Sequence, residues 1–188
     1  MEKNSRKTAL DRDAWIHTAL AALAEHGAEA LRVEVLAKHC GVTKGSFYWH
    51  FKNRRDLIEA VLDTWKRGRI IDIQKQTRAE PGEELQAIYH TIEVYAAVKN
   101  RKGILIELAV RDLARRDVTA MATVEEVDAI RLDCAKRLFL ACGLSEREAT
   151  ARSLLLYAYV FGQSLMRYER YAKDGNEVKR WIAEHIAQ

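Results

Sequence analysis

One proline and nine glycines are all that interrupt a chain of 188 residues. Proline and glycine are the residues that most often end or weaken a helix, so this chain can form long helices. Apolar residues also recur at steps of three and four, as Ile16, Leu20 and Leu23 do near the start. The sequence therefore predicts an all-α fold of about nine helices.

The expected helices end where glycine, proline or a short polar turn interrupts the apolar pattern. In the first half they cover residues 11–26, 33–40 and 43–50, followed by a long helix that opens at residue 53. In the second half they cover residues 83–99, 102–114, 117–142, 145–171 and 175–187. Capping boxes support two of the starts, Asn53 with Asp56 and Ser145 with Glu148. Pro81 is expected in the first turn of the helix that follows it.

The charge of the chain is unevenly distributed. Residues 1–55 hold ten basic and six acidic side chains, whereas residues 56–188 hold twenty-one of each. The whole net charge of +4 therefore lies on the first segment. A polyanionic partner such as nucleic acid would explain this excess, although a solvated basic face is the simpler alternative.

The three cysteines, Cys40, Cys134 and Cys142, have neither CxxC nor another metal-site spacing. We expect reduced thiols in a cytoplasmic protein, with no metal and no cofactor. The first fifteen residues lack the apolar core of a signal peptide. The longest apolar run, from Leu154 to Gly162, is far shorter than the roughly 18–20 residues that cross a bilayer. No membrane partner is expected.

The segment from Val33 to Leu57 carries the strongest functional pattern. Two short helices joined at Cys40-Gly41-Val42 have the layout of a helix-turn-helix. Ala37, four residues before Gly41, lets the two helices cross closely, and Gly41 suits a left-handed turn. We therefore expect a DNA-binding domain over residues 1–55, followed by a helical domain over residues 56–188.

The second helix of the motif would enter the major groove with its N-terminus first. Its first residues are small or cationic: Thr43, Lys44, Gly45 and Ser46. Tyr48, Trp49 and His50 lie one turn further, and Lys52, Arg54 and Arg55 begin the next helix. Gly45 costs a helix about 1 kcal/mol relative to alanine, which a close approach of DNA would explain. Phe47 and Phe51 are expected in the core instead.

The run GVTKGSFYWHFKNRRDL resembles the signature of the TetR family of transcriptional regulators. The matching residues are Gly41, Val42, Thr43, Lys44, Gly45, Tyr48, His50, Phe51 and Leu57, with Gly27, Leu36 and Ala37 upstream. The resemblance covers about residues 10–60, and the remainder matches by helical layout alone. The family usually has a Ser or Thr cap where this chain has Leu31-Arg32, and Arg54 replaces a usual lysine.

The resemblance implies a role for each residue of this run. Thr43, Tyr48, His50 and the backbone near Lys44 would hold phosphates, and Arg32 would reach a phosphate in place of the missing cap. Lys44, Gly45, Ser46 and Trp49 would face base edges, where the sequence is read. For His50, capping a helix is an equally open alternative.

The resemblance also implies a homodimer formed through the last two long helices. The expected interface residues are Leu154, Leu155, Tyr159, Gly162, Met166, Trp181 and Ile182. Gly162 would allow close helix approach, although a packing glycine is an equal alternative. A helix that is apolar nearly all round, as Leu154–Met166 is, must be buried on all sides, which a partner subunit would supply. The two reading helices would lie roughly 34 Å apart on a palindromic site.

The middle helices of the family usually enclose a pocket for a small-molecule effector. Candidate lining residues in this chain are Tyr89, Glu93, Glu107, Arg111, Tyr157 and Phe161. Glu107 and Arg111, four residues apart, could instead simply pair with each other. An effector would release DNA only as far as it favours the state with the reading helices spread apart.

The sequence thus predicts a DNA-binding transcriptional repressor that a small-molecule effector releases. No catalytic residues are expected, because the chain has no phosphate-binding glycine loop, no HExxH and no GxSxG. The alternatives are an activator or an effector-independent regulator on the same fold, an architectural DNA binder, and, from another class, a helical-bundle enzyme.

Overall fold

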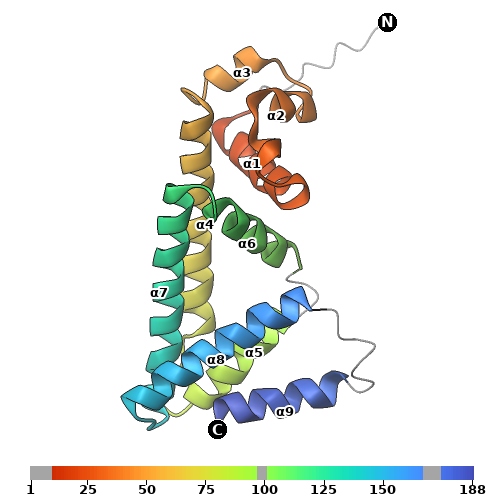
Figure 1. Cartoon of the computed structure of the whole chain (residues 1–188). Coiled ribbons are helices and arrows are strands. Elements are labelled where there is room, and N and C mark those ends of the chain that lie inside the picture. The colour runs from red at the N-terminus through yellow and green to blue at the C-terminus, as the bar shows by residue number, and fades with distance from the viewer. Residues whose placement is uncertain (1–9, 97–100, 167–174) are drawn as a thin grey trace, which may run out of the picture. The chain divides into compact units, whose positions relative to one another are not determined.

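The computed structural model of the chain describes residues 10–96, 101–166 and 175–188. These residues form nine α-helices and one short 3-10 helix, which confirms the all-α prediction (Figure 1). The first five elements are α1 (Arg12–His26), η1 (Ala28–Leu31), α2 (Val33–His39), α3 (Lys44–Tyr48) and α4 (Arg54–Gln76). The others are α5 (Glu84–Ala96), α6 (Arg101–Ala114), α7 (Val118–Ala141), α8 (Glu146–Leu165) and α9 (Gly175–Ala187).

The chain divides into two compact units. The first unit holds residues up to Lys66 together with Leu105–Val124, and the second holds Arg67–Ile104 together with Glu125–Gln188. The helices α4, α6 and α7 each contribute residues to both units. Residues 1–9 of the predicted DNA-binding domain, and residues 97–99 and 167–171 of two predicted helices, lie outside the described residues.

Aromatic side chains form the core of the first unit. Trp15 on α1 is fully buried and meets the ring of Phe47 edge to face, with 5.6 Å between ring centroids. Phe47 in turn stacks on Phe51 at 5.3 Å, and both rings are buried. The expectation that these two phenylalanines belong to the core is therefore confirmed.

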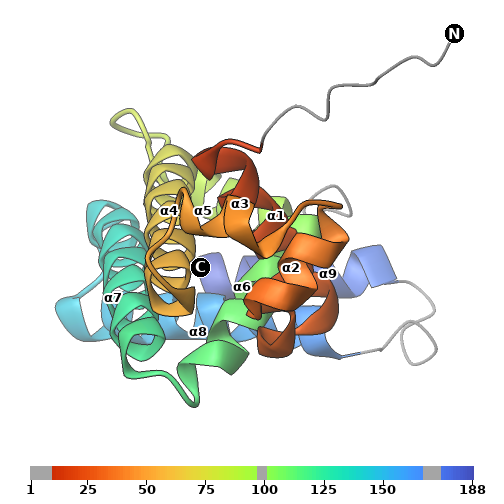
Figure 2. The same cartoon turned by 90° about the horizontal axis from the view of Figure 1, so that it is seen from above.

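Gly41 makes the sharp turn between α2 and α3. Its φ of 64° lies in the left-handed region, which glycine enters without the steric cost that other residues carry. The N–H of Val42 donates to the carbonyl of Ala37 at 3.0 Å, and this bond closes the end of α2. The turn places α2 and α3 side by side, next to α1 (Figure 2).

The second unit is built on α5, α8 and α9, which pack against one another around a common apolar core (Figure 1). The core includes Ile88, Phe139, Leu156, Val160 and Ile186. The guanidinium of Arg152 on α8 donates to the backbone carbonyls of Ile186 at 3.0 Å and Gln188 at 2.7 Å. These bonds fix the end of α9 against α8.

Two expectations about helix ends are wrong, whereas the other predicted boundaries within the described residues lie within two residues of the observed ones. Pro81 and Gly82 form a turn, and α5 begins only at Glu84, so the prediction that Pro81 lies in the first helical turn is wrong. Gly82 has a φ of 94°, a conformation that no helix accepts. The helix α8 ends at Leu165, because Met166 is extended, six residues before the predicted end.

The three cysteines are free thiols, and Cys134 is buried. Burial raises the pKa of the Cys40 and Cys142 thiols. Within the described ranges, no helix is both long enough and apolar enough to cross a membrane.

Candidate nucleic-acid interface

Two aromatic residues at the end of the short helix α3, Tyr48 and the C-cap residue Trp49, are exposed. Its N-cap is Thr43, whose Oγ1 accepts a hydrogen bond from the N–H of Ser46 at 3.4 Å. Phe47 occupies the buried side of the helix, and the following residues are therefore turned toward solvent. Tyr48 is 59% exposed and Trp49 is 87% exposed, so two large aromatic side chains adjacent in sequence lie at the surface.

Gly45 on α3 is not required by the packing of the protein. A Cβ atom added there would meet only the Oγ1 of Thr43, at 3.6 Å, which is an ordinary contact distance. The position is exposed, and its φ is not in the left-handed region. No feature of the described first unit therefore accounts for a glycine here.

Lys44, the first residue of α3, is paired with an acidic residue of α2. Its Nζ lies 2.8 Å from Oε1 of Glu34, and both side chains are more than half exposed. The hydrogen bond from Lys44, with its charge, holds the pKa of the Glu34 carboxyl below its usual value. Nothing in the local sequence pattern predicted this pair, because the two residues lie on different helices.

Two predicted DNA-contacting arginines bind backbone carbonyls. Arg54 donates from Nε to the carbonyl of Leu31 at 3.2 Å and from Nη2 to that of Ala28 at 3.1 Å. Arg32 donates to the carbonyl of Glu29 at 3.3 Å and occupies the N-cap position of α2 without a side-chain cap bond. Both guanidiniums thus fasten the ends of η1 at the surface of the first unit.

The remaining predicted DNA contacts are Ser46 on α3 and two residues between α3 and α4, His50 and Lys52. Lys52 is exposed, whereas Ser46 and His50 are half-buried. The Oδ1 of Asn53 accepts from the N–H of Asp56 at 3.0 Å, as the predicted capping box requires. The carboxylate of Asp56 in turn accepts a hydrogen bond from the N–H of Lys52, at 2.9 Å, one residue earlier than the motif normally reaches.

Arg55 connects the start of α4 to the start of α7 within the first unit. It donates to Glu59 at 2.9 Å, to Asp117 at 2.6 Å, and to the hydroxyl of Thr119. Asp117 also caps α7, because its Oδ1 accepts from the N–H groups of Thr119 and Ala120. We refer to Arg55, Glu59, Asp117 and Thr119 as the Arg55 cluster.

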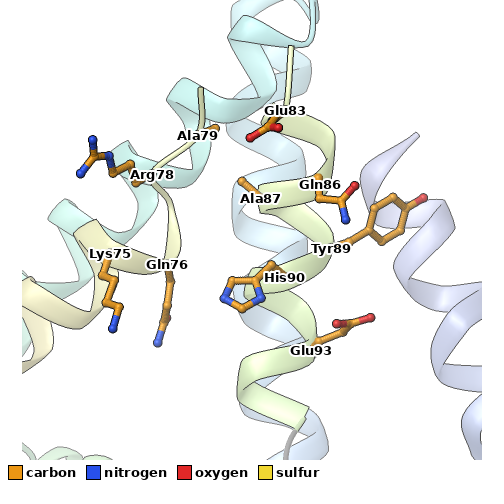
Figure 3. A pocket seen from close by; sticks show the side chains of 10 residues that line it. All are labelled: Lys75, Gln76, Arg78, Ala79, Glu83, Gln86, Ala87, Tyr89, His90 and Glu93. Atoms are coloured by element: carbon orange, nitrogen blue, oxygen red, sulfur yellow. The ribbon is translucent and has the colours of Figure 1, made fainter. Parts of the chain in front are cut away.

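A cleft of about 410 Å³ lies in the second unit, between the end of α4 and one side of α5 (Figure 3). Two of the predicted effector-contacting residues, Tyr89 and Glu93, are among the residues that line it. The other lining residues are Lys75, Gln76, Arg78, Ala79, Glu83, Gln86, Ala87 and His90. Residues of both charges thus line this surface depression, and Figure 3 shows the side chains of Tyr89 and Glu93 pointing away from the end of α4.

The other four predicted pocket residues lie elsewhere. Glu107 is buried and accepts from Arg111 at 2.9–3.0 Å, which is the intrahelical pair that the sequence left open. Tyr157 is buried, and Phe161 is partly buried. The guanidinium of Arg131 lies over both rings, at 5.5 and 5.1 Å from their centroids, and is itself buried. Sequence reasoning missed Arg131, since a basic residue on a long helix predicts a solvent-exposed position.

A strip of uncharged residues on α8 remains exposed. Leu154, Ala158, Gly162 and Leu165 recur at steps of three and four and thus share one face of the helix. Leu154, Leu155, Leu165 and Met166 are each more than half exposed, so in the single chain this helix is not buried on all sides. Tyr159 and Gly162 are partly buried, as is Ile182 on α9, while Trp181 is 58% exposed.

In the comparisons with known proteins, this chain is similar to regulators of transcription. The family model described as "Bacterial regulatory proteins, tetR family" matches residues 16–61, which include α2, the turn and α3. The chain is 22% identical to the HTH-type transcriptional regulator AcrR of Shigella flexneri, over 98% of this chain and 90% of that protein. It is 44% identical to the class C tetracycline repressor protein of Escherichia coli over 54 residues, which are 29% of this chain and 25% of that protein.

Solved structures share the same fold. A putative TetR-family transcriptional regulator from Rhodococcus sp. aligns with a TM-score of 0.69. The alignment covers 94% of this chain and 98% of that structure, at 16% sequence identity. The arrangement of helices therefore extends the similarity beyond the residues that the family model matches.

Proposed function

This chain belongs to the TetR family of bacterial transcriptional regulators, and from that premise we propose that it is a repressor. It would bind a palindromic operator as a homodimer and leave the operator when a small-molecule effector binds. The observation that carries the proposal is the packed first unit, which turns Lys44, Gly45 and Trp49 outward on one short helix. The relatives named above are regulators of transcription, and no enzymatic activity is proposed.

The proposed DNA-contacting residues form two groups: those that would contact phosphates and those that would contact base edges. The hydroxyls of Thr43 and Tyr48 and the ring of His50 would bind phosphates, which fixes the register on the duplex. Lys44, Ser46 and Trp49 would meet base edges in the major groove, and Gly45 would let the backbone approach them. Lys52, Arg32 and Arg54 would add phosphate contacts. The two arginines can do so because a guanidinium carries five N–H donors, and each uses only some of them on carbonyls.

The exposed strip on α8 supports a dimer. Exposed apolar side chains gathered on one helix face of a soluble protein usually mark an interaction site. The helix α9, which packs against α8 in the second unit, carries a further exposed apolar side chain, Trp181. Gly162 meets no side chain within 4 Å of an added Cβ, so a partner helix would have room to approach closely there. Two-fold symmetry would then give two reading helices and a palindromic site.

The cleft between α4 and α5 supports an effector site. Its volume falls within the range of about 300–1,000 Å³ that is typical of small-molecule pockets. Lys75, Arg78 and His90 supply hydrogen-bond donors, and Glu83 and Glu93 supply acceptors, so the cleft suits a polar effector. The effector would relieve repression only by the amount that its affinity differs between the two states of the dimer.

Selection of bound duplexes from a random DNA pool, combined with the salt dependence of binding, tests the proposal. We expect an enriched inverted repeat with half-site centres about 10 base pairs apart, or a multiple of this. The logarithm of the affinity should fall linearly with that of the salt concentration, by about 0.9 per phosphate contacted. Enrichment of no duplex would reject a sequence-specific regulator. Enrichment of one unrepeated half-site would reject the dimer.

A further inference from the structure

We propose that Glu34 is a positioning residue that sets the sequence specificity of this regulator. It would hold the ammonium of Lys44 toward base edges and prevent Lys44 from acting as a general phosphate-binding cation. The inference rests on the proposed DNA binding through α3. It concerns a residue that the family resemblance did not single out and that the charge pattern alone would place among residues unfavourable to DNA.

The geometry places a carboxylate directly at the reading surface. Glu34 is the second residue of α2 and Lys44 is the first residue of α3, and their charged atoms are 2.8 Å apart. The side chains are 61% and 58% exposed, so neither is drawn to the other by burial. Lys44 lies on the surface that would contact DNA in the proposed complex. The carboxylate of Glu34, which is hydrogen-bonded to Lys44, would therefore lie at that surface as well.

The pair changes what the lysine can do. An ammonium has three N–H donors on a flexible stem, and free lysines bind phosphates as mobile point charges. The bond to Glu34 uses one donor and fixes the position of Nζ, and two donors remain for acceptors such as guanine O6 and N7. A fixed position is what base readout requires and what phosphate binding does not.

The pair also lowers the net positive charge of the surface that would bind DNA nonspecifically. Nonspecific binding depends almost entirely on phosphate neutralisation, and the Lys44–Glu34 pair has no net charge to offer. The lowered pKa of Glu34 keeps this carboxylate ionised at neutral pH. Removing the negative charge should therefore help nonspecific binding more than it helps operator binding, which lowers the ratio between the two.

Glu34→Gln tests this, with Glu25→Gln as the matched control. Glu25 lies on α1 of the same unit, is similarly exposed, and does not contact Lys44. Affinity is measured by fluorescence anisotropy for the selected operator and for a scrambled duplex of the same length, over a range of salt concentrations. For Glu34→Gln we expect the ratio of the two affinities to fall about tenfold, as for the loss of one base contact. The salt dependence on the scrambled duplex should steepen by about 0.9 per bound subunit.

The same two measurements in a Lys44→Met background show whether Glu34 acts through Lys44. There, Glu34→Gln should change the affinity ratio by less than about twofold, because no ammonium remains to be positioned. The proposal is overturned if Glu34→Gln leaves the ratio of the wild-type protein unchanged, if Glu25→Gln lowers it equally, or if the full effect persists without Lys44. A wild-type protein that does not distinguish the two duplexes rejects the proposed function itself, and is thus a separate outcome.

Discussion

The packing of the first unit leaves room for a methyl group at Gly45, although glycine weakens a helix at that position. Gly45→Ala should therefore keep or raise the free energy of unfolding, by up to about 1 kcal/mol. The same methyl group would lie where DNA is expected to approach, so operator affinity should fall by about tenfold or more, roughly the weight of one good contact. Denaturant unfolding and anisotropy titration measure the two effects separately.

Gly68→Ala is the matched control for this substitution. Gly68 also lies within a helix, α4, and an added Cβ there meets nothing within 4 Å. It should gain similar stability and leave operator affinity unchanged. If Gly45→Ala keeps full operator affinity, then close approach of DNA is not the reason for the glycine.

Tyr48 should act on all DNA sequences alike. Its ring meets Phe47 edge to face at 5.2 Å, and this contact does not need the hydroxyl. With the proposed phosphate contact, Tyr48→Phe would remove only a hydrogen bond to a charged group, worth about 1.5 kcal/mol and thus about tenfold in affinity. Operator and scrambled duplexes should weaken by the same factor. A loss confined to the operator would instead assign Tyr48 to base reading.

The sequence predicted which residues form α3 and the turn before it, because the helix-turn-helix motif is defined by residues close together in the chain. It did not predict the hydrogen-bond partners of the arginines that follow. Arg54 binds carbonyls 23 and 26 residues away, and Arg55 binds side chains 62 and 64 residues away. Contacts over such separations depend on how whole helices pack, and no pattern within one helix encodes them.

At the scale of helices, the Arg55 cluster joins α4 to α7. Arg55 is 45% exposed, so its ion pair with Asp117 should contribute only about 0.5–1 kcal/mol after solvent screening. A double-mutant cycle with Arg55→Ala and Asp117→Asn, read by denaturant unfolding, should return a coupling of this size. Asparagine can still cap α7, whereas Asp117→Ala should cost about 1 kcal/mol more. Equal losses for the Asn and Ala variants would show that the cap contributes nothing.

The capping box of α8 predicts a pH dependence. The hydrogen bond from Ser145 holds the pKa of the Glu148 carboxyl below its usual value. A carboxyl with a lowered pKa in the folded state adds stability that is complete above the unfolded pKa. This stability is lost as the pH falls through the folded value. The stability difference between wild type and Glu148→Gln should thus be constant from pH 8 to about 6 and shrink below about 4.5. A difference that stays constant into the acid range would contradict the bond.

Helix boundaries were predictable where a residue cannot continue the helix. Gly27, Gly41 and Gly143 all have positive φ and follow helix ends close to the expected ones. The start of α5 was misplaced because proline suits a turn as well as a first helical turn, and Gly82 decides between them. The early end of α8 has no comparable signal, since Leu165 and Met166 are both good helix formers.

At the scale of the whole molecule, the sequence predicted the helical class and the basic N-terminal segment. The uncharged run in α8 also indicated that this helix is buried. The sequence did not show whether the burying residues belong to the same chain or to a partner subunit. Leu156 and Val160 pack into the core, whereas Leu154 and Leu155 remain more than half exposed. The periodicity of the run is the same for both faces, so only the packed structure separates them.

The exposed face of α8 yields a prediction about assembly. In a two-fold dimer each substituted residue enters the interface twice, so one carboxylate per chain would bury two unpaired charges in the interface. Leu154→Glu should therefore convert the dimer to a monomer at micromolar concentration, as measured by sedimentation velocity.

Ile71→Glu is the control, since Ile71 is 64% exposed on α4 and lies outside the α8 face. The monomer should still fold, because Leu154 is more than half exposed and is not part of the core of its own chain. It should bind a single half-site weakly while losing preference for the inverted repeat. If Leu154→Glu stays dimeric and keeps that preference, the partner subunit must be bound through another surface.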